Sequence, residues 1–245
     1  MTPQTILFDL DDTLVHCNKY FEMVIDQFVD EMLSWFSGHG LTPQQVKDKQ
    51  LEVDLAGVNI HGFKPERFPQ SFVETYRLYA EQFGRRTSPD EEQFLMKLGR
   101  TVYTYSVEPY PHMAETLDIL SDAGHKLFLY TGGDASIQRA KVRDSGLHRY
   151  FDDRIFVTLH KNTDFMRSIV TEQGFDTSRT WMIGNSVRTD VIPALEAGLH
   201  CIHIPAKNDW HYNVGEVTVS PKGAFLTLSS LQDVPPAIRE YAGRR

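Results

Sequence analysis

Apolar and polar positions follow two different periodic patterns along this chain. After Pro109, short apolar runs alternate with amphipathic stretches. The apolar runs predict strands at residues 126–130, 154–158, 180–183 and 200–204. The amphipathic stretches predict helices that end near glycines, at about 112–123, at about 135–145 and before 174 and 198. This alternation is typical of a parallel sheet with helices on both faces.

A further apolar run, residues 6–8, lies near the N-terminus and is short enough for a buried strand. It ends in three carboxylates, Asp9, Asp11 and Asp12. Because side chains alternate along a strand, Asp9 and Asp11 are expected to start on the same side. Two like charges that close repel, and the pKa of one rises unless a cation lies between them. The pair predicts a functional site, whereas Asp12 is interpreted as a turn residue.

Residues 18–105 show a helical periodicity instead. Apolar side chains recur every three or four residues over 18–37 and about 70–83, which predicts two helices. Thr42-Pro43-Gln44-Gln45 predicts a helix start with an N-cap, a proline at the first position and a capping-box glutamine. Ser88-Pro89 repeats that pattern before a fourth helix.

The two periodic patterns predict an α/β domain that is interrupted by a helical segment. The first strand belongs with the later ones, so the helical stretch is an insertion into one domain. We expect a Rossmann-like parallel sheet with helices on both faces, formed by residues 1–15 and 107–245, with the first strand in a central position. Residues 16–106 are expected to form an inserted α-helical cap domain.

Composition narrows the possible partners and compartments. The chain has 245 residues, 41% of them hydrophobic, and a net charge of −8, which argues against a nucleic-acid partner. No apolar run approaches the roughly 20 residues needed to span a bilayer, and no signal region opens the chain. Cys17 and Cys201 are too few and too distant to indicate a disulfide framework, which favours a cytoplasmic location.

Polar residues of types suited to catalysis or ligand binding follow four of the predicted strands. Open α/β sheets place ligands at the carboxyl ends of their strands, so these loops are expected to converge. In chain order they carry Asp9 and Asp11, then Thr131 and Gly132, then Lys161, then Asn185 and Asp190.

These four loops resemble, in order, the four motifs of the haloacid dehalogenase superfamily, most of whose members are phosphatases. The first motif corresponds to Asp9-Leu10-Asp11-Asp12-Thr13, and the second to an apolar strand ending in Thr131. The third corresponds to Lys161 before a helix, and the fourth to Gly184-Asn185-Ser186 followed by Asp190. The resemblance covers the whole sheet domain.

The resemblance implies hydrolysis of a phosphate monoester. Asp9 is then the nucleophile that forms an aspartyl-phosphate, and Asp11 is the acid that protonates the leaving group and the base that activates water. Thr131 and the Gly132 amide are expected to bind phosphate oxygens, while Lys161 supplies fixed positive charge.

The resemblance also implies a magnesium ion, since an anionic nucleophile must approach a dianionic ester. Its expected ligands are the Asp9 carboxylate, the Asp11 backbone carbonyl, Asn185 and Asp190. Asn185 departs from the pattern, because most relatives carry Asp there. An amide oxygen can bind Mg²⁺ but brings no charge.

Other activities on the same framework remain open. A dehalogenase requires neither Asp11 nor a metal, so retention of Asp11 favours a phosphatase. A phosphomutase would use the same core residues, and a phosphonate hydrolase would need a lysine from the cap. A weakly catalytic protein that binds a phosphorylated ligand is the non-enzymatic alternative, supported only by Asn185.

We expect a small phosphorylated metabolite as partner, with no nucleic acid and no membrane, in a monomer or homodimer. Candidate specificity residues are His16, Tyr20 and the loop 64–67. Trp210, His211 and Tyr212, after the last predicted strand, are candidate contacts at the rim of the site or with the cap.

Overall fold

The structure is a computed structural model that describes residues 2–207 and 209–243. The chain forms two compact units. One comprises Met1–Asn18 and Val107–Arg245 and contains the sheet, and the other comprises Lys19–Ser106 and is helical. The interpretation of the helical unit as a cap stays a prediction.

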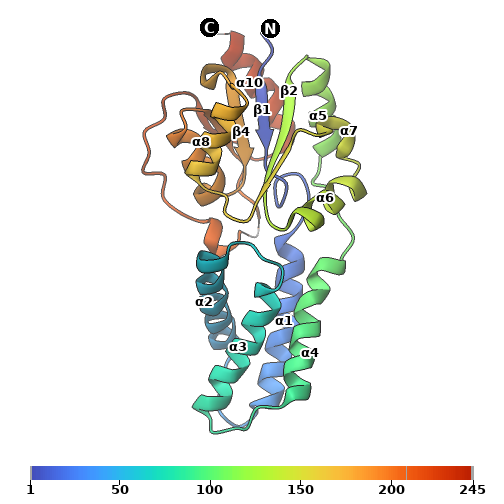
Figure 1. The fold of residues 1–245 in the computed structure, drawn as a ribbon, viewed down its shortest axis with the longest axis vertical. Coiled ribbons are helices and arrows are strands. Elements are labelled where there is room, and N and C mark those ends of the chain that lie inside the picture. The colour runs from blue at the N-terminus through green and yellow to red at the C-terminus, as the bar shows by residue number, and fades with distance from the viewer. Residues whose placement is uncertain (1, 208, 244–245) are drawn as a thin grey trace. The chain divides into compact units, whose positions relative to one another are not determined.

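The sheet has six strands in the order β3-β2-β1-β4-β5-β6, and every neighbouring pair is parallel. The first strand, β1, lies between β2 and β4 (Figure 1), as predicted. The register sets Phe8 beside Leu129 on one neighbour and beside Ile183 on the other. The strands are β1 (Thr5–Phe8), β2 (Lys126–Gly132), β3 (Ile155–Thr158), β4 (Thr180–Gly184), β5 (His200–His203) and β6 (Phe225–Thr227).

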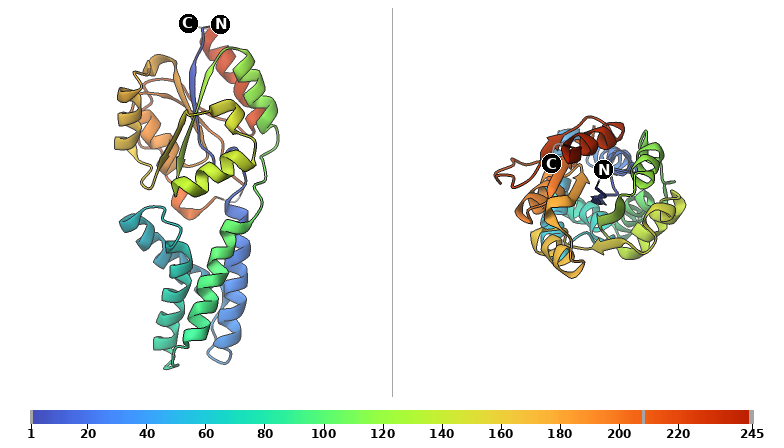
Figure 2. Two further views of the ribbon diagram at one scale, coloured as in Figure 1. Left: turned by 45° about the vertical axis from the view of Figure 1, so that its right-hand side comes forward. Right: turned by 90° about the horizontal axis from the view of Figure 1, so that it is seen from above.

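Both faces of the sheet are apolar, which explains why its central strands read as continuous hydrophobic runs. Ile6 and Phe8 belong to one buried cluster, whereas Leu7, between them, belongs to another. Helices lie on both sides of the sheet (Figure 2). The first cluster includes residues of α5 (Met113–Asp122), α6 (Ala135–Asp144), α7 (His148–Phe151) and α10 (Val234–Gly243). The second includes residues of α8 (Thr163–Glu172) and α9 (Ile192–Glu196).

The sheet extends beyond the expected last strand. The sequence pattern ended the alternation at the strand near residue 200, but β6 adds a sixth strand beside β5. β6 has only three residues and is not fully buried, so its apolar run is too short to predict a strand. Short helical turns complete the described elements: η1 (Thr101–Thr104), η2 (Thr177–Arg179), η3 (Val187–Val191), η4 (His211–Asn213) and η5 (Leu231–Asp233).

The helical unit has its own core, in which Phe28 stacks on Phe72 with ring centroids 4.2 Å apart. The capping box at Thr42 is confirmed, with the Thr42 hydroxyl accepting the Gln45 amide and the Gln45 side chain accepting the Thr42 amide. Ser88 differs from expectation, because its side chain makes no capping bond and its amide donates to the Tyr76 hydroxyl. The helices are α1 (Asn18–Trp35), α2 (Pro43–His61), α3 (Arg67–Gln82) and α4 (Pro89–Arg100), side by side in Figure 1.

Residues 16–18 are tied to the sheet unit by specific hydrogen bonds. The Asp12 carboxylate accepts the backbone amides of Cys17 and Asn18, at 3.0 and 2.9 Å. Burial raises the pKa of Asp12 to about 6, against those two bonds. The His16 amide donates to the Glu108 carbonyl at 2.8 Å. This bond joins the segment that leaves the sheet unit after β1 to the segment that returns to it near residue 107. Asp12 is thus a turn residue with a structural task.

Both cysteines are free thiols, and among the described residues no helix has the length and apolar character of a membrane span.

A buried carboxyl group makes the helical unit sensitive to pH. Burial raises the pKa of Asp54 to about 7, although Arg67 opposes the rise. The folded state therefore holds this proton more tightly than the unfolded chain, and stability falls as pH rises from about 4 to about 7. We expect Asp54→Asn to remove this loss and to raise the free energy of unfolding at pH 8 by about 2–4 kcal/mol, with little change at pH 4. Denaturant titrations at both pH values measure it. Asp48→Asn, an exposed carboxylate on the same helix, is the matched control, and an equal effect of the two substitutions contradicts the assignment.

Candidate active site

The predicted site residues follow the carboxyl ends of adjacent strands within the sheet unit. Asp9 follows β1, Thr131 and Gly132 end β2, Lys161 comes after β3 and Asn185 follows β4. Asp190 lies on the π-helical turn η3, a form of helix that is frequent at functional sites. All but Gly132 and Asp11 are buried.

The centre of the site is one lysine between two buried carboxylates. Lys161 Nζ lies 2.6 Å from Asp9 Oδ1 and 2.5 Å from Asp190 Oδ1. Burial raises the pKa of Asp9 to about 7, with Lys161 opposing and Asp190 adding to the rise. Burial alone would lower the pKa of Lys161, but Asp190 and Asp9 raise it. The ammonium group is therefore the cation that lets the two carboxylates coexist.

Asp190 reaches this position because Gly184 leaves room for it. A Cβ atom on Gly184 would lie 2.2 Å from Asp190 Oδ2, so any larger residue would clash with the carboxylate. The Ser186 amide donates to the same oxygen at 2.9 Å. Asp190 is thus engaged by Lys161 and Ser186, and its place among metal ligands stays a prediction.

A threonine hydroxyl connects the nucleophile candidate to the fourth motif. Thr13 Oγ1 donates to Asp9 Oδ2 at 2.9 Å and lies 3.4 Å from Asn185 Oδ1. Sequence reasoning assigned no role to Thr13, although it ends the first motif. Its hydroxyl brings the carboxylate of one strand and the amide of the next to a common point.

Asp11 is held by two residues of α6 that sequence reasoning missed. Gln138 Nε2 donates to Asp11 Oδ2 at 2.8 Å and to Thr131 Oγ1 at 2.6 Å. Lys141 Nζ lies 2.6 Å from Asp11 Oδ1, so both carboxylate oxygens have a partner. The two residues are three apart on one face of α6, so both reach Asp11. Asp134 is the N-cap of that helix, and its carboxylate accepts the Ser136 and Ile137 amides.

Asn185 is fixed on three sides. Its Nδ2 donates to Asp209 Oδ1 at 3.1 Å, and its backbone carbonyl lies 2.9 Å from His203 Nε2. Its Oδ1 faces Thr13. Burial raises the pKa of Asp209, against the hydrogen bond from Asn185. Sequence reasoning did not find Asp209, because no motif spacing connects it to the fourth strand.

The donor set suits a hard divalent cation. Asp9 Oδ2 and Asn185 Oδ1 are oxygen ligands that approach the same hydroxyl, and both residues are buried. Among residues 2–207 and 209–243, no three His, Cys, Asp or Glu side chains form a metal-binding group. A metal ion bound at this point would therefore need the amide of Asn185 as well as the carboxylate of Asp9.

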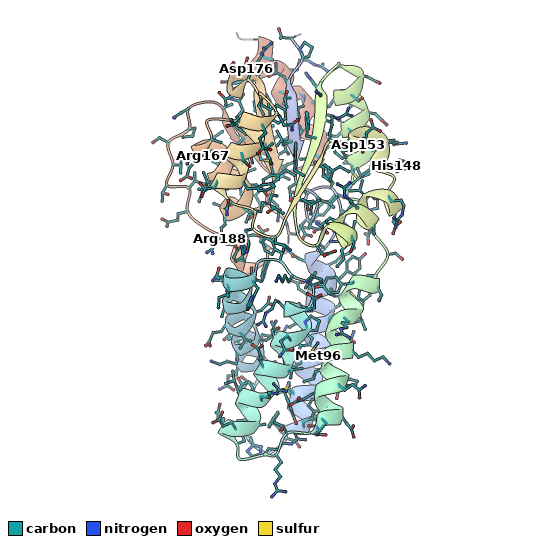
Figure 3. The ribbon with its side chains drawn as sticks, in the orientation of Figure 1. Met96, His148, Asp153, Arg167, Asp176 and Arg188 are labelled. Atoms are coloured by element: carbon teal, nitrogen blue, oxygen red, sulfur yellow. The ribbon has the colours of Figure 1, made fainter. Side chains whose placement is uncertain are left out.

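The remaining candidates lie in other packed arrangements. His16 stacks on Tyr110 within the sheet unit, whereas Tyr20 stacks on Tyr105 within the helical unit. In the loop after β5, Trp210 stacks on Tyr212, and the Arg188 guanidinium lies over the Tyr212 ring. Arg188 belongs to η3, at the end of the sheet unit opposite Asp176 (Figure 3). Their roles toward a substrate stay predictions.

Comparison with known proteins identifies the family. The family model of the haloacid dehalogenase-like hydrolases matches residues 3–198 of this chain. The chain belongs to this family. Its fold is shared with a haloacid dehalogenase-like hydrolase from Xanthomonas campestris, at 26% identity, with 99% of each chain covered and a TM-score of 0.79.

Two further relatives show the range of the family. A glyceraldehyde 3-phosphate phosphatase from Methanocaldococcus jannaschii is 24% identical over 81% of this chain and 83% of its own. L-2-haloacid dehalogenase from Xanthobacter autotrophicus is 17% identical, with 97% of this chain and 99% of its own covered and a TM-score of 0.56. The dehalogenase shows that the fold alone does not select the reaction.

The lysine between two carboxylates makes a testable stability prediction. Lys161→Met leaves Asp9 and Asp190 facing each other without a cation, so we expect the free energy of unfolding at pH 8 to fall by about 3–5 kcal/mol. Adding Asp190→Asn removes one of the like charges and is expected to restore part of the loss. Denaturant titration measures both, with the exposed Lys97→Met as control. If the double variant is no more stable than Lys161→Met, charge repulsion is not the cause.

Proposed function

We propose that this haloacid dehalogenase-like hydrolase is a magnesium-dependent phosphatase of small phosphate monoesters. The observation that carries the proposal is the arrangement around Asp9, with Lys161 on one oxygen and Thr13 on the other, 2.6 and 2.9 Å away. A carboxylate that is held at both oxygens is oriented toward one line of attack. The low exposure of Asp9 keeps competing water away from it.

Asp9 attacks phosphorus and forms an aspartyl-phosphate, which water then hydrolyses. Asp11, held by Gln138 and Lys141, protonates the leaving alkoxide and later takes a proton from the water. Thr131 and the Gly132 amide bind phosphate oxygens, and Lys161 offsets their charge. Retention of Asp11 favours a phosphatase over a dehalogenase, whose halide leaves without a proton.

Asp9, Asn185 and the Asp11 backbone carbonyl would hold the magnesium ion in this proposal. When bound, it offsets the charge of the phosphate dianion beside the nucleophile. The substrate class follows the relatives that are named glyceraldehyde 3-phosphate phosphatases. Glyceraldehyde 3-phosphate is therefore the first substrate to test, followed by other small phosphorylated metabolites.

The test is phosphate release from a panel of small esters, with magnesium and with a chelator. We expect hydrolysis only with magnesium, and we expect Asp9→Asn to lower it by on the order of 10⁴-fold or more, because an amide cannot form the acyl phosphate. Asp134→Asn, which keeps a capping residue, is the control. Halide release from a 2-haloacid without magnesium, or near-native activity of Asp9→Asn, contradicts the proposal.

The role of Asp11 is tested separately by leaving-group dependence. Asp11→Asn keeps an acceptor for Gln138 but cannot donate or take a proton. We expect the rate for alkyl phosphates to fall by about 10²–10⁴-fold, and the rate for p-nitrophenyl phosphate to fall much less, since its leaving group needs no proton. An equal loss for both classes contradicts protonation of the leaving group by Asp11 and places its effect on binding or on hydrolysis of the aspartyl-phosphate.

A further inference from the structure

We propose that Asp209 is the positioning residue that makes the neutral Asn185 an effective metal ligand. It does so by fixing the orientation of the amide and by supplying, one hydrogen bond away, the negative charge that position 185 lacks. This inference rests on the proposed magnesium-dependent function and assigns the task to a residue outside all four motifs.

The orientation argument follows from the chemistry of the two side chains. A carboxylate only accepts hydrogen bonds, whereas an amide donates from nitrogen and accepts at oxygen. Asp209 Oδ1, 3.1 Å from Asn185, therefore selects Nδ2. The opposite end of the amide, Oδ1, is left facing Thr13 at 3.4 Å, next to Asp9 Oδ2. Without Asp209, a flip of the amide would present two N–H donors to a cation.

The backbone beneath Asn185 is held as well. His203 Nε2 lies 2.9 Å from the Asn185 carbonyl, and the Ile204 amide donates to the Gly184 carbonyl at 3.0 Å. With its backbone carbonyl and Nδ2 both engaged, Asn185 has Oδ1 as the atom that can bind a metal ion. A ligand that is already oriented loses little entropy when it binds a metal.

Asp209 also places a negative charge next to the neutral Asn185. A hydrogen bond to an ionised acceptor polarises the amide and increases the electron density on its oxygen. Asp209 thus strengthens Asn185 as a ligand without placing a further carboxylate directly beside Asp9 and Asp190, which already share one ammonium group. The outer partners of metal ligands are typically worth 10–100-fold in metal affinity.

A purely structural role is the alternative. Asp209 also accepts a hydrogen bond from the Ala206 amide, within the loop that follows β5. If loop closure were its only task, its removal would lower the melting temperature of the metal-free protein and leave magnesium affinity unchanged.

The experiment measures magnesium binding by calorimetry, together with the melting temperature of each metal-free variant. We expect Asp209→Ala to weaken magnesium affinity by about 10–100-fold. Asp209→Asn keeps an acceptor for Asn185 but loses the charge, so we expect an intermediate loss. Asp176→Asn, which removes an exposed carboxylate at the opposite end of the sheet unit (Figure 3), is expected to bind magnesium as the unaltered protein does.

An exchange variant separates position from charge. Asn185→Asp alone sets two carboxylates against each other, so its gain in affinity is expected to be small. Asn185→Asp with Asp209→Asn restores a donor–acceptor pair and moves the charge onto the ligand, and we expect it to bind magnesium at least as tightly as the unaltered protein. Native affinity in a folded Asp209→Ala overturns the inference alone. Failure of the unaltered protein to bind magnesium contradicts the proposed function itself.

Discussion

The contact of Lys161 with Asp9 and Asp190 is the constraint on which the site depends. Two carboxylates that are buried together repel each other, and burial makes each charge costly. One ammonium group at 2.5–2.6 Å from both resolves this conflict. The surrounding structure serves this contact: Gly184 has no side chain where Asp190 passes, and Ser186 and Thr13 take the remaining oxygens of the two carboxylates.

The sheet explains how residues so distant in sequence reach one ammonium group. β1 occupies the position at which the strand order changes direction, with β2 and β3 on one side and β4 to β6 on the other. At such a point, the loops on either side diverge and leave a crevice at the carboxyl ends of the strands. Asp9 lies there, with Thr131 from one neighbouring strand and Asn185 from the other.

The charges of the site form a connected system rather than a set of independent motif residues. Lys141 pairs with Asp11, Lys161 pairs with Asp9 and Asp190, and Asp209 pairs with the Asn185 amide. A carboxylate at position 185 would add a further negative charge to the most crowded part of this system. The neutral amide backed by Asp209 keeps the charge nearby while separating it from Asp9 by one side chain.

The sequence by itself determined the α/β class, the central position of β1 and the order in which the motif residues appear. The class and the order of the motifs follow from local patterns, since apolar runs, helix caps and polar strand ends each involve only a few consecutive residues. The central position of β1 was inferred because Asp9 needs the other motif loops on both of its sides. The short edge strand β6 carried too weak a pattern to be predicted. Only the tertiary structure brought Gln138, Lys141 and Asp209 to the site, because their partners lie far away in the chain and no fixed spacing encodes a contact between separate loops. The same reason applies to Asp190: the motif indicated the residue, and the fold decided that its carboxylate meets Lys161.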